Sequence, residues 1–575
     1  MAAFFEELEA DIQRFEEKVA GAAAAKSDAE LGAWVERIGM VNDLNGRLEE
    51  VSEFSICISS ADTSDEGAPL VAGRVAALGA RLKAAMISFD AQLAAIPEAL
   101  WEQLLAQDGV REVEFALQER RRLVQEMLPA GQETLISALA VDGFQAWERF
   151  FEKVIGRVRM EIELDGDVQE HSLSTIFSLF QNTDAKIRRS AFQQGVEVLK
   201  GEAELCAAAL NSIVGFRLQT YKARGWESPL HESLLINGMT EATLTSMWSA
   251  VEKNLGRVAQ YLERRKQLQG QETLHFVDLY APAVGKSSKK VTWEECAEII
   301  IEQFGTVSGQ MQDLARRAFE EGWMDCEPSP QKAPVGFCAS FPVTGESRIL
   351  GTFSGNLSSV STLIAHEIGH AFHYSVLKDL PRLAQIYSKS TAETASTFAE
   401  RLVMDALLKK VEDPADRIAL LASKLDNAMI YCMFTYSAFL FDRSFYAERA
   451  EGLVSAERIT ELLLQAQKTA YCDALDGYNE WQWLSHGHYY DTVTPFYNYP
   501  YTFGSLFSAG IYAMALREGA AFEDKYIALL RDTGRMTVED LAAKHLGVDL
   551  TQEAFWEDAM GIMTGDLEEF LELTK

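Results

Sequence analysis

Histidine side chains, the usual nitrogen ligands of zinc, are distributed unevenly along this chain. Five of the nine fall in two windows, residues 366–373 and 486–488. The first window contains a His-Glu-x-x-His sequence, in which His366 and His370 are four residues apart and Glu367 follows the first. Side chains at i and i+4 project from one face of a helix, so both imidazoles can bind one Zn²⁺. Glu367 could then hold and deprotonate a metal-bound water, which predicts a zinc hydrolase.

A catalytic zinc takes three protein ligands and keeps a fourth position open, so a further ligand is needed. The metzincin continuation is absent, because His373 stands where that pattern has glycine. His373 shares the helix face but lies nearly one turn beyond His370, too far along the axis for the same tetrahedral ion. We therefore expect His373 to line the cleft or to support a ligand from the second coordination shell.

Two glutamates downstream are candidates for the third ligand. Pro381 ends the histidine helix, and a new helix is expected to begin near Ser390 and to carry Glu393 and Glu400, seven residues apart on one face. Ser390-x-x-Glu393 also matches a capping box, which would give Glu393 a purely structural role. Either glutamate could reach the zinc if the two helices pack antiparallel. Spacing alone favours Glu393 modestly and leaves Glu400 open.

The second histidine window is rich in hydrogen-bond donors. Zinc-assisted hydrolysis of a carbonyl compound places negative charge on the former carbonyl oxygen, and neutral donors nearby lower the barrier. The imidazoles and phenols available are those of His486, His488, Tyr489, Tyr490, Tyr497, Tyr499 and Tyr501. The alternative is an aromatic core segment, although clustered phenols and imidazoles are difficult to satisfy in a dry core.

The elements that must position these residues are mostly helical. Apolar residues recur at helical spacing up to about Glu320 and again from about Val360 onward. Between them, residues 327–355 hold four of the 13 prolines and several glycines, and the runs 337–341 and 348–353 are predicted to be two short strands. The second run is a candidate edge strand that could pair with an extended substrate, the alternative being a hairpin without substrate contact.

Composition excludes several classes of protein. Asp and Glu number 86 against 53 Lys and Arg, a net charge of −33, which argues against nucleic acid or an anionic membrane as a partner. The seven cysteines are scattered and never form Cys-x-x-Cys, as in a reduced intracellular protein. The longest apolar run, residues 428–441, is too short to span a bilayer, and the first residues do not resemble a signal peptide. A cytoplasmic protein is expected.

The motifs, in this order, resemble those of the oligoendopeptidase F branch of the thimet-oligopeptidase-like zinc peptidases. The resemblance covers the chain from about Thr183 onward. It is carried by His-Glu-Ile-Gly-His-Ala-Phe-His at 366–373, Glu-Thr-Ala-Ser-Thr-Phe-Ala-Glu at 393–400, His-Tyr-Tyr at 488–490, Pro-Phe-Tyr-Asn-Tyr at 495–499 and Asn-Gly-Met-Thr at 237–240.

The resemblance implies specific roles for several of these residues. One zinc ion per chain would be bound by His366, His370 and Glu393, while Glu400 would orient a ligating histidine. The oxyanion donors it implies are His488, Tyr497 and Tyr499. The segment between residues 491 and 494 is longer than the family's usual pattern, so Tyr490 or Tyr501 could take the place of one tyrosine.

The resemblance also implies the architecture and the reaction. The fold would be mostly α, a two-lobed helical body around a deep substrate channel, with a helical N-terminal region (1–185) and a catalytic region (186–575). The activity would be zinc-dependent hydrolysis of internal bonds in short unfolded oligopeptides. Two alternatives stay open: a zinc carboxypeptidase acting at peptide ends, and a non-catalytic peptide-binding homologue.

Overall fold

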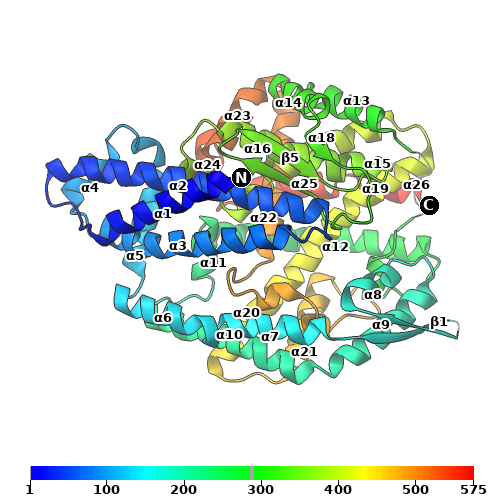
Figure 1. Cartoon of the computed structure of the whole chain (residues 1–575). Helices are drawn as coiled ribbons and strands as arrows, with labels where there is room; N and C mark the ends of the chain where they lie inside the picture. The colour runs from blue at the N-terminus through cyan, green and yellow to red at the C-terminus, as the bar shows by residue number, and fades with distance from the viewer. Residues whose placement is uncertain (1, 165, 285–289) are drawn as a thin grey trace. The chain divides into compact units, whose positions relative to one another are not determined.

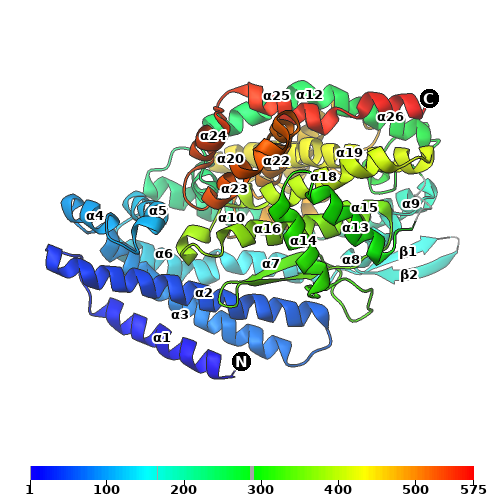
Figure 2. The same cartoon turned by 90° about the horizontal axis from the view of Figure 1, so that it is seen from above.

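Helices dominate the computed structural model, which describes residues 2–164, 166–284 and 290–575 (Figures 1 and 2). The described strands form only a two-stranded and a three-stranded sheet. The prediction of a mostly α fold is therefore confirmed. Within the described ranges, no helix is both long enough and apolar enough to cross a membrane.

The chain divides into two compact units, and each combines three segments of sequence. Unit 1 comprises Met1–Ala130, Lys290–Leu407 and Met514–Val548, and unit 2 comprises Gly131–Lys289, Leu408–Ala513 and Asp549–Lys575. The predicted division after residue 185 does not coincide with these units, because both draw on the early and the late parts of the chain. The predicted channel between two lobes stays a prediction.

The first segment of unit 1 is a group of helices packed through aromatic side chains. These helices are α1 (Ala2–Ala20), α2 (Leu31–Ala61), α3 (Ala68–Ala94), α4 (Glu98–Leu105) and α5 (Glu114–Glu126). The Phe89 ring of α3 lies 6.0 Å from Phe15 of α1 and 5.5 Å from Trp34 of α2, measured between ring centroids. All three rings are fully buried, so this aromatic cluster holds the three long helices together.

The later segments of unit 1 supply the small sheet and the helices that follow it. In chain order they are α13 (Trp293–Phe304), α14 (Gly309–Glu320), β3 (Met324–Asp325), β4 (Phe337–Phe341), β5 (Glu346–Leu350), α15 (Leu357–Ser359), η4 (Val360–Ala365), α16 (His366–Leu377), η5 (Arg382–Gln385), α17 (Lys389–Ala392), α18 (Thr394–Lys410), α23 (Glu523–Asp532) and α24 (Val538–Leu546).

The three-stranded sheet has the order β3-β5-β4. Strand β4 pairs antiparallel with β5, with Phe337 opposite Leu350, and β3 runs parallel to β5 on its other side. The predicted strand 337–341 is confirmed, whereas the second strand begins two residues earlier than expected. The prediction that this second strand is an edge strand is wrong, because β3 pairs with it on the side away from β4. β3 was not foreseen because its two residues are too few to show the alternation that predicts a strand. Among the described strands, β4 is left with one unpaired edge.

Unit 2 consists of helices and one hairpin. They are α6 (Ala130–Gly143), α7 (Gln145–Gly156), β1 (Met160–Leu164), β2 (Asp167–His171), α8 (Leu173–Phe180), α9 (Ala185–Lys200), α10 (Ala203–Arg224), α11 (His231–Asn237), α12 (Glu241–Leu268), η3 (Phe276–Leu279), α19 (Pro414–Met429), α20 (Thr435–Glu451), α21 (Ala456–Ala470), η8 (Gly487–Tyr490), α22 (Tyr499–Glu518), α25 (Glu553–Thr564) and α26 (Leu567–Leu573). The apolar stripe of α12, which includes Leu244, Met247 and Val251, is buried, as its spacing predicts.

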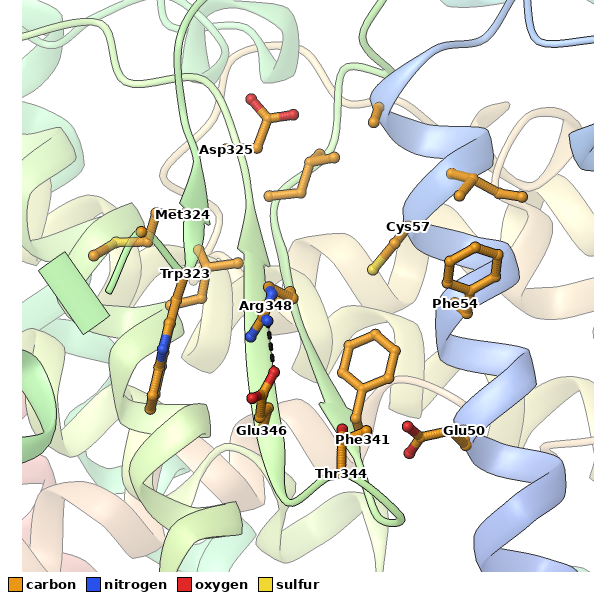
Figure 3. Close-up of a pocket in the computed structure, with 15 residues that line it drawn as sticks. Glu50, Phe54, Cys57, Trp323, Met324, Asp325, Phe341, Thr344, Glu346 and Arg348 are labelled. Atoms are coloured by element: carbon orange, nitrogen blue, oxygen red, sulfur yellow. Dashed lines mark hydrogen bonds and ion pairs between the residues drawn. The ribbon is translucent and has the colours of Figure 1, made fainter. Parts of the chain in front are cut away.

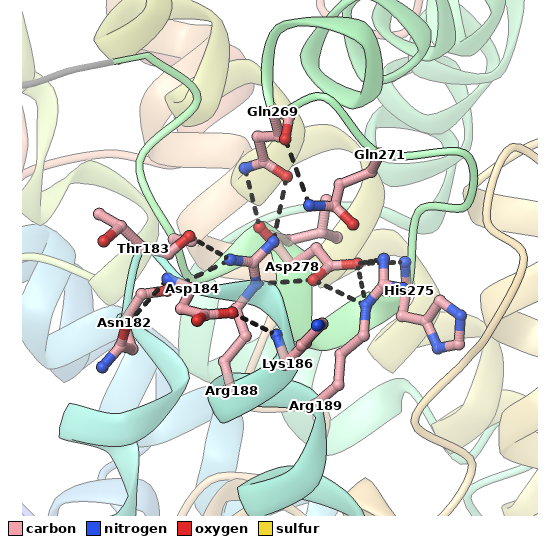
Figure 4. A network of polar contacts seen from close by, with 12 residues as sticks. Asn182, Thr183, Asp184, Lys186, Arg188, Arg189, Gln269, Gln271, His275 and Asp278 are labelled. Carbon is pink, nitrogen blue, oxygen red and sulfur yellow. Dashed lines mark hydrogen bonds and ion pairs between the residues drawn. The ribbon is translucent and has the colours of Figure 1, made fainter.

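A buried ionic network in unit 2 ties α9 to η3 (Figure 4). The carboxylate of Asp278, which is fully buried, accepts hydrogen bonds from Arg188 Nε at 2.6 Å, Arg189 Nε at 3.0 Å and the His275 backbone amide at 2.8 Å. Burial disfavours its charged form, but these donors outweigh that cost and lower the pKa of Asp278. Both carboxylate oxygens of Asp278 therefore accept hydrogen bonds.

Candidate metal centre

The His-Glu-x-x-His sequence begins α16, directly after the six-residue π-helical segment η4. Together with α15, these elements form the helical stretch expected from about Val360 onward, which starts slightly earlier than expected. Short π-helical turns within helices occur frequently at functional sites. Here the turn comes immediately before the side chains of His366, Glu367 and His370.

Glu393 lies at a break between two helices. It follows α17 and precedes α18, with φ −88° and ψ 6°. Ser390 lies inside α17, where the N-cap position belongs to Ser388, so the capping-box interpretation of Glu393 is wrong. The carboxylate instead accepts a hydrogen bond from Ser396 Oγ at 2.6 Å, which fixes its direction.

The three predicted ligands lie together. Glu393 Oε2 is 3.4 Å from His366 Nε2 and 3.4 Å from His370 Nε2, and all three ligand atoms lie within 4.8 Å of one another. These separations exceed a normal N–H···O hydrogen bond. They match the edge of a tetrahedron around an ion with bonds of 2.0–2.2 Å, which is about 3.3–3.6 Å. Elsewhere in the described chain, no three His, Cys, Asp or Glu side chains gather in this way.

Gly369, between the two histidines, allows this convergence. A Cβ atom at Gly369 would lie 2.6 Å from the Cα of Ser396 and 2.7 Å from the carbonyl oxygen of Ala395. Backbone atoms cannot yield as a flexible side chain can, so only glycine permits α16 to approach the start of α18 this closely. The close approach places Glu393 beside the histidines. The sequence contained this residue within the motif but gave no sign of its packing role.

Glu400 lies on the same side of α18 as Glu393, two helical turns further on. Its Oε2 is 3.4 Å from Nδ1 of His366, the ring nitrogen that does not face Glu393. Carboxylates commonly hold a ligating histidine in this way. Burial disfavours protonation of His366, but Glu400, Glu393 and Glu367 together raise its pKa to about 9. Burial likewise opposes ionisation of Glu393, yet His370 and His366 lower its pKa to about 2. The site therefore favours a cation.

Glu367 is the buried acid of the site. Glu367 is only 5% exposed, and its Oε2 is buried without a hydrogen-bond partner. Burial raises the pKa of Glu367, with a further contribution from Glu393, while His366 and His370 partly oppose the shift. A buried carboxylate oxygen without a partner, next to a group of metal-ligand atoms, is suited to bind a water or substrate proton.

His373 does not line a cleft. It is fully buried, its Nε2 lies 2.9 Å from Thr533 Oγ1 and 3.3 Å from the Leu530 carbonyl oxygen, and its ring stacks on Tyr387 at 4.4 Å. Burial lowers the pKa of His373 to about 3, so the ring is neutral. The prediction of a cleft histidine is wrong, because α23 covers this end of α16, and only the tertiary packing shows that. Its hydrogen bonds and ring contact are made with Thr533, Leu530 and Tyr387 rather than with His366, His370 or Glu393.

The second histidine window forms a row of rings in unit 2. The His488 ring stacks on Tyr497 at 4.0 Å and lies 6.2 Å from Tyr501, which is 37% exposed. Asn498 Oδ1 lies 2.9 Å from His488 Nδ1 and 3.4 Å from His486 Nε2, so it fixes both imidazoles. Burial lowers the pKa of His486 to about 4, which keeps that ring neutral. Nothing in the sequence indicated that Asn498 would hold the two imidazoles, beyond its position among aromatic residues.

Tyr499 is turned the other way, into the core. It is fully buried at the start of α22, and its hydroxyl oxygen accepts hydrogen bonds from Ser233 Oγ at 3.1 Å and Asn237 Nδ2 at 3.2 Å. This arrangement contradicts the role of oxyanion donor expected for Tyr499. Of the two substitutes, Tyr490 is also buried and donates to the Trp483 carbonyl, so only Tyr501 is accessible. Asn237, part of the 237–240 motif, supports Tyr499.

Comparisons with known proteins identify the family of this chain. The sequence profile of Peptidase family M3 matches residues 178–562, and that of Oligopeptidase F matches residues 92–159. An oligoendopeptidase F homolog of Borreliella burgdorferi is 26% identical over 465 residues, covering 80% of this chain and 76% of that protein.

Two solved structures share the fold over almost the whole chain. A putative peptidase from Chlamydophila abortus has a TM-score of 0.84 at 19% identity and covers 99% of this chain and 96% of its own. Oligoendopeptidase-F from Enterococcus faecium has a TM-score of 0.73 at 20% identity, with 99% and 98% covered.

Proposed function

The chain belongs to peptidase family M3, in its oligoendopeptidase F branch, and on this basis we propose that it is a zinc-dependent endopeptidase acting on short, unfolded peptides. Membership confirms the resemblance seen in the motifs, and it makes the protein a peptidase of a metallopeptidase family. The observation that carries the finer proposal is the 3.4 Å spacing of Glu393 Oε2 from both histidine nitrogens, beside the unpartnered carboxylate of Glu367.

His366, His370 and Glu393 would hold one zinc ion. Two imidazole nitrogens and one carboxylate oxygen are a donor set typical of catalytic zinc in peptidases, and their spacing fits zinc bond lengths. When bound, zinc would polarise a peptide carbonyl and increase the acidity of water at the site. Glu400 would orient His366 through Nδ1, and the convergent negative charge would retain the ion.

Glu367 would move the proton. It accepts a proton from the attacking water and delivers it to the nitrogen of the leaving amine. Its burial supports this role, because the raised pKa brings its proton affinity closer to that of a base working near neutral pH. The unpartnered Oε2 is the atom that we assign to this transfer.

The unpaired edge of β4 would bind the substrate backbone. A peptide in extended conformation can add to a free strand edge through main-chain hydrogen bonds, which select conformation rather than sequence. Gly336, just before β4, passes Glu367 closely: a Cβ atom there would lie 3.6 Å from Glu367 Oε1. This edge replaces the strand that the sequence suggested.

His488, Tyr497 and Tyr501 would stabilise the oxyanion. Imidazole and phenol groups are suitable donors, and Tyr501 is the accessible hydroxyl of the ring row. Asn498 and the stacked Tyr497 ring restrict the orientation of His488. In this assignment Tyr501 takes the place first given to Tyr499.

Cleavage of an internally quenched peptide, blocked at both ends, tests the proposal. Wild type should cut it, and Glu367→Gln should keep stoichiometric zinc while kcat falls about 10²–10⁴-fold. Tyr501→Phe should lower kcat by roughly 10²-fold, the effect of losing one oxyanion donor. The matched control Tyr499→Phe removes a buried hydroxyl and should leave kcat unchanged.

Other outcomes would contradict the proposal in different ways. If wild type binds zinc but leaves the blocked peptide intact, a peptidase acting on chain ends or a peptide-binding protein fits better, and peptides with free ends separate these two. Absence of stoichiometric metal from both proteins would reject the metal site itself.

We also propose a cytoplasmic location. All seven cysteines are free in the structure, as expected in a reducing compartment. Recovery of the native protein in the soluble cytoplasmic fraction of its source cells would support this, and recovery outside the cytoplasm would contradict it.

A further inference from the structure

Two pockets of unit 1 lie beside the three-stranded sheet, and they differ in whether all their charged groups have partners. The larger, of about 540 Å³, lies between α2 and strands β3 and β5 (Figure 3). Its charged groups already have partners: Arg348 with Glu346 at 2.6 Å, Asp325 with Lys332 at 2.6 Å, and Glu50, which accepts from the Val343 backbone amide at 2.9 Å. We call the second, of about 260 Å³, the edge pocket; it is lined by Glu53, the ion pair of Glu49 with Arg382, Cys338, Ser340, Tyr374 and Tyr387, among others.

The edge pocket lies beside the strand proposed to bind substrate. Cys338 and Ser340 line it from β4, and no residue of β3 or β5 does. Two residues apart on a strand, these side chains share one face. On the opposite wall, Glu53 comes from α2. A peptide added to the unpaired edge of β4 would therefore direct a side chain toward this pocket.

The edge pocket is also reached by the helix that carries the two histidines of the proposed metal site. Tyr374 continues the stripe of His366 and His370 along α16, at i+8, and it lines the pocket. Its hydroxyl donates to the carbonyl of Phe341, at the end of β4, at 3.0 Å, whereas the start of β4 passes Glu367. The pocket-lining residues Cys338 and Ser340 are two and four residues beyond Gly336, about 7–13 Å along the strand.

Glu53 gives the edge pocket a negative charge without a partner. Its neighbour Glu49 forms an ion pair with Arg382, but Glu53 has no hydrogen bond or ion pair in the described part of the chain. Burial, with the charge of Glu49, raises the pKa of Glu53 to about 7, although Arg382 partly opposes this. A cation in the pocket would stabilise the charged form. The rings of Tyr374 and Tyr387 offer apolar surface to an aliphatic chain.

We propose that the edge pocket is a substrate subsite in which Glu53 selects lysine or arginine, two to four residues from the cleaved bond. Long basic side chains combine an aliphatic stem with a charged end, which matches the tyrosine walls and the free carboxylate. This inference rests on the proposed peptidase function and adds its substrate preference.

A scan of peptides tests the subsite. Internally quenched peptides, blocked at both ends, carry one lysine at successive positions on either side of the cleaved bond, with matched glutamine and glutamate peptides. At one position, wild type should show kcat/KM about tenfold higher for lysine than for glutamine. In Glu53→Gln this ratio should fall to about one while the glutamine peptide is cut as before. Glu53→Lys should favour glutamate at that position.

Glu50→Gln is the matched control. It removes the same charge from the same helix, three residues away, but on the larger pocket, so the preference for lysine should persist. The subsite is rejected if no position prefers lysine, if the preference survives Glu53→Gln, or if Glu50→Gln abolishes it equally.

Binding separates this inference from the proposed function. The same peptides are titrated, by fluorescence anisotropy, onto zinc-loaded Glu367→Gln with and without Glu53→Gln. If wild type cuts nothing but lysine peptides bind about tenfold tighter in a Glu53-dependent manner, the subsite stands and the endopeptidase proposal fails. Cleavage without any lysine preference supports the endopeptidase and rejects the subsite. Absence of a Glu53-dependent difference in binding also rejects the subsite.

Discussion

Two clusters of buried charged and polar groups, one in each unit, are satisfied to very different extents. In unit 2, the carboxylate of Asp278 is surrounded by donors from Arg188, Arg189 and the His275 amide. In unit 1, the carboxylate of Glu393 faces two imidazole nitrogens at 3.4 Å, and Glu367 Oε2 has no partner. The first cluster is complete within the chain, whereas the second leaves polar atoms for the cation that we propose it binds.

The electrostatic consequences follow the same division. Bound donors lower the pKa of Asp278 despite its burial, which is the signature of a structural network. Around the proposed metal ligands the pKa shifts have opposite directions. The pKa of Glu367 is raised and that of Glu393 is lowered, although both side chains are buried. Groups whose environments separate their pKa values are those that an enzyme can use as acid and base. Burial of charge by itself therefore does not identify a functional site; here the signal is an unpartnered carboxylate oxygen next to three converging ligand atoms.

Breaking the structural network should have the largest effect on stability. Asp278→Asn removes the charge that two arginines share, and the free energy of unfolding should fall by about 3–5 kcal/mol. Denaturant unfolding with far-UV circular dichroism measures this. Glu197→Gln, on the same helix as both arginines but in an exposed pair with Lys200, should change it by less than about 1 kcal/mol.

The pH dependence adds a check on the same residue. Because the folded pKa of Asp278 is below its unfolded value, its stabilising contribution is present above about pH 4 and is lost as the pH falls through the folded pKa. Wild type and Asp278→Asn should therefore converge in stability toward low pH. A constant difference down to pH 2 would contradict this account.

Removing zinc tests the cluster that lacks a partner. At a free zinc concentration 100 times its Kd, binding should stabilise the folded protein by about 2.7 kcal/mol, and a chelator should abolish this gain. Thermal unfolding with and without zinc measures it. Glu393→Gln, which lacks the carboxylate ligand, should show little zinc-dependent change in Tm; an equal shift in both proteins would place the ion elsewhere.

Gly369→Ala tests the close approach that assembles the ligands. The added Cβ would meet backbone atoms of Ala395 and Ser396, so the free energy of unfolding should fall by about 1–3 kcal/mol and zinc binding should weaken. Urea unfolding and zinc titration measure both effects. The control is Gly39→Ala, in open space on α2, which should stabilise the protein by about 0.5–1 kcal/mol. A neutral Gly369→Ala would show that α16 and α18 are not held this closely.

Glu400→Gln should have the most confined effect, on zinc affinity alone. It keeps the shape of the side chain but removes the charge beside His366 Nδ1, so zinc affinity should fall about 10–100-fold. Competition with a chromophoric chelator gives the affinity. If zinc binds as tightly as to wild type, Glu400 does not support the ligand.

The sequence predicted much of the site because its strongest signals are local. The i, i+4 spacing of His366 and His370 places both on one helix face wherever that helix lies. Strand 337–341 and the buried stripe of α12 were similarly readable from periodicity. His373 was misplaced because its surroundings, Thr533 and Leu530, are more than 150 residues away in the chain.

In the aromatic window, too, the sequence alone could not show which side chains are buried. Tyr497, Tyr499 and Tyr501 are chemically identical and alternate in the sequence, so nothing local separates the two partly exposed rings from the buried one. The distinction comes from the start of α22 and from Ser233 and Asn237, which hold Tyr499 inside.

The amino-acid sequence by itself determined the mostly helical class, the two zinc-binding histidines proposed here and the base beside them, because helical period fixes which neighbours share a face. The tertiary structure decided which glutamate meets the histidines, which strand edge is free and where Glu53 lies without a partner. Those features depend on segments from distant parts of the chain packing together, and Gly369 allows one such contact through the absence of a side chain.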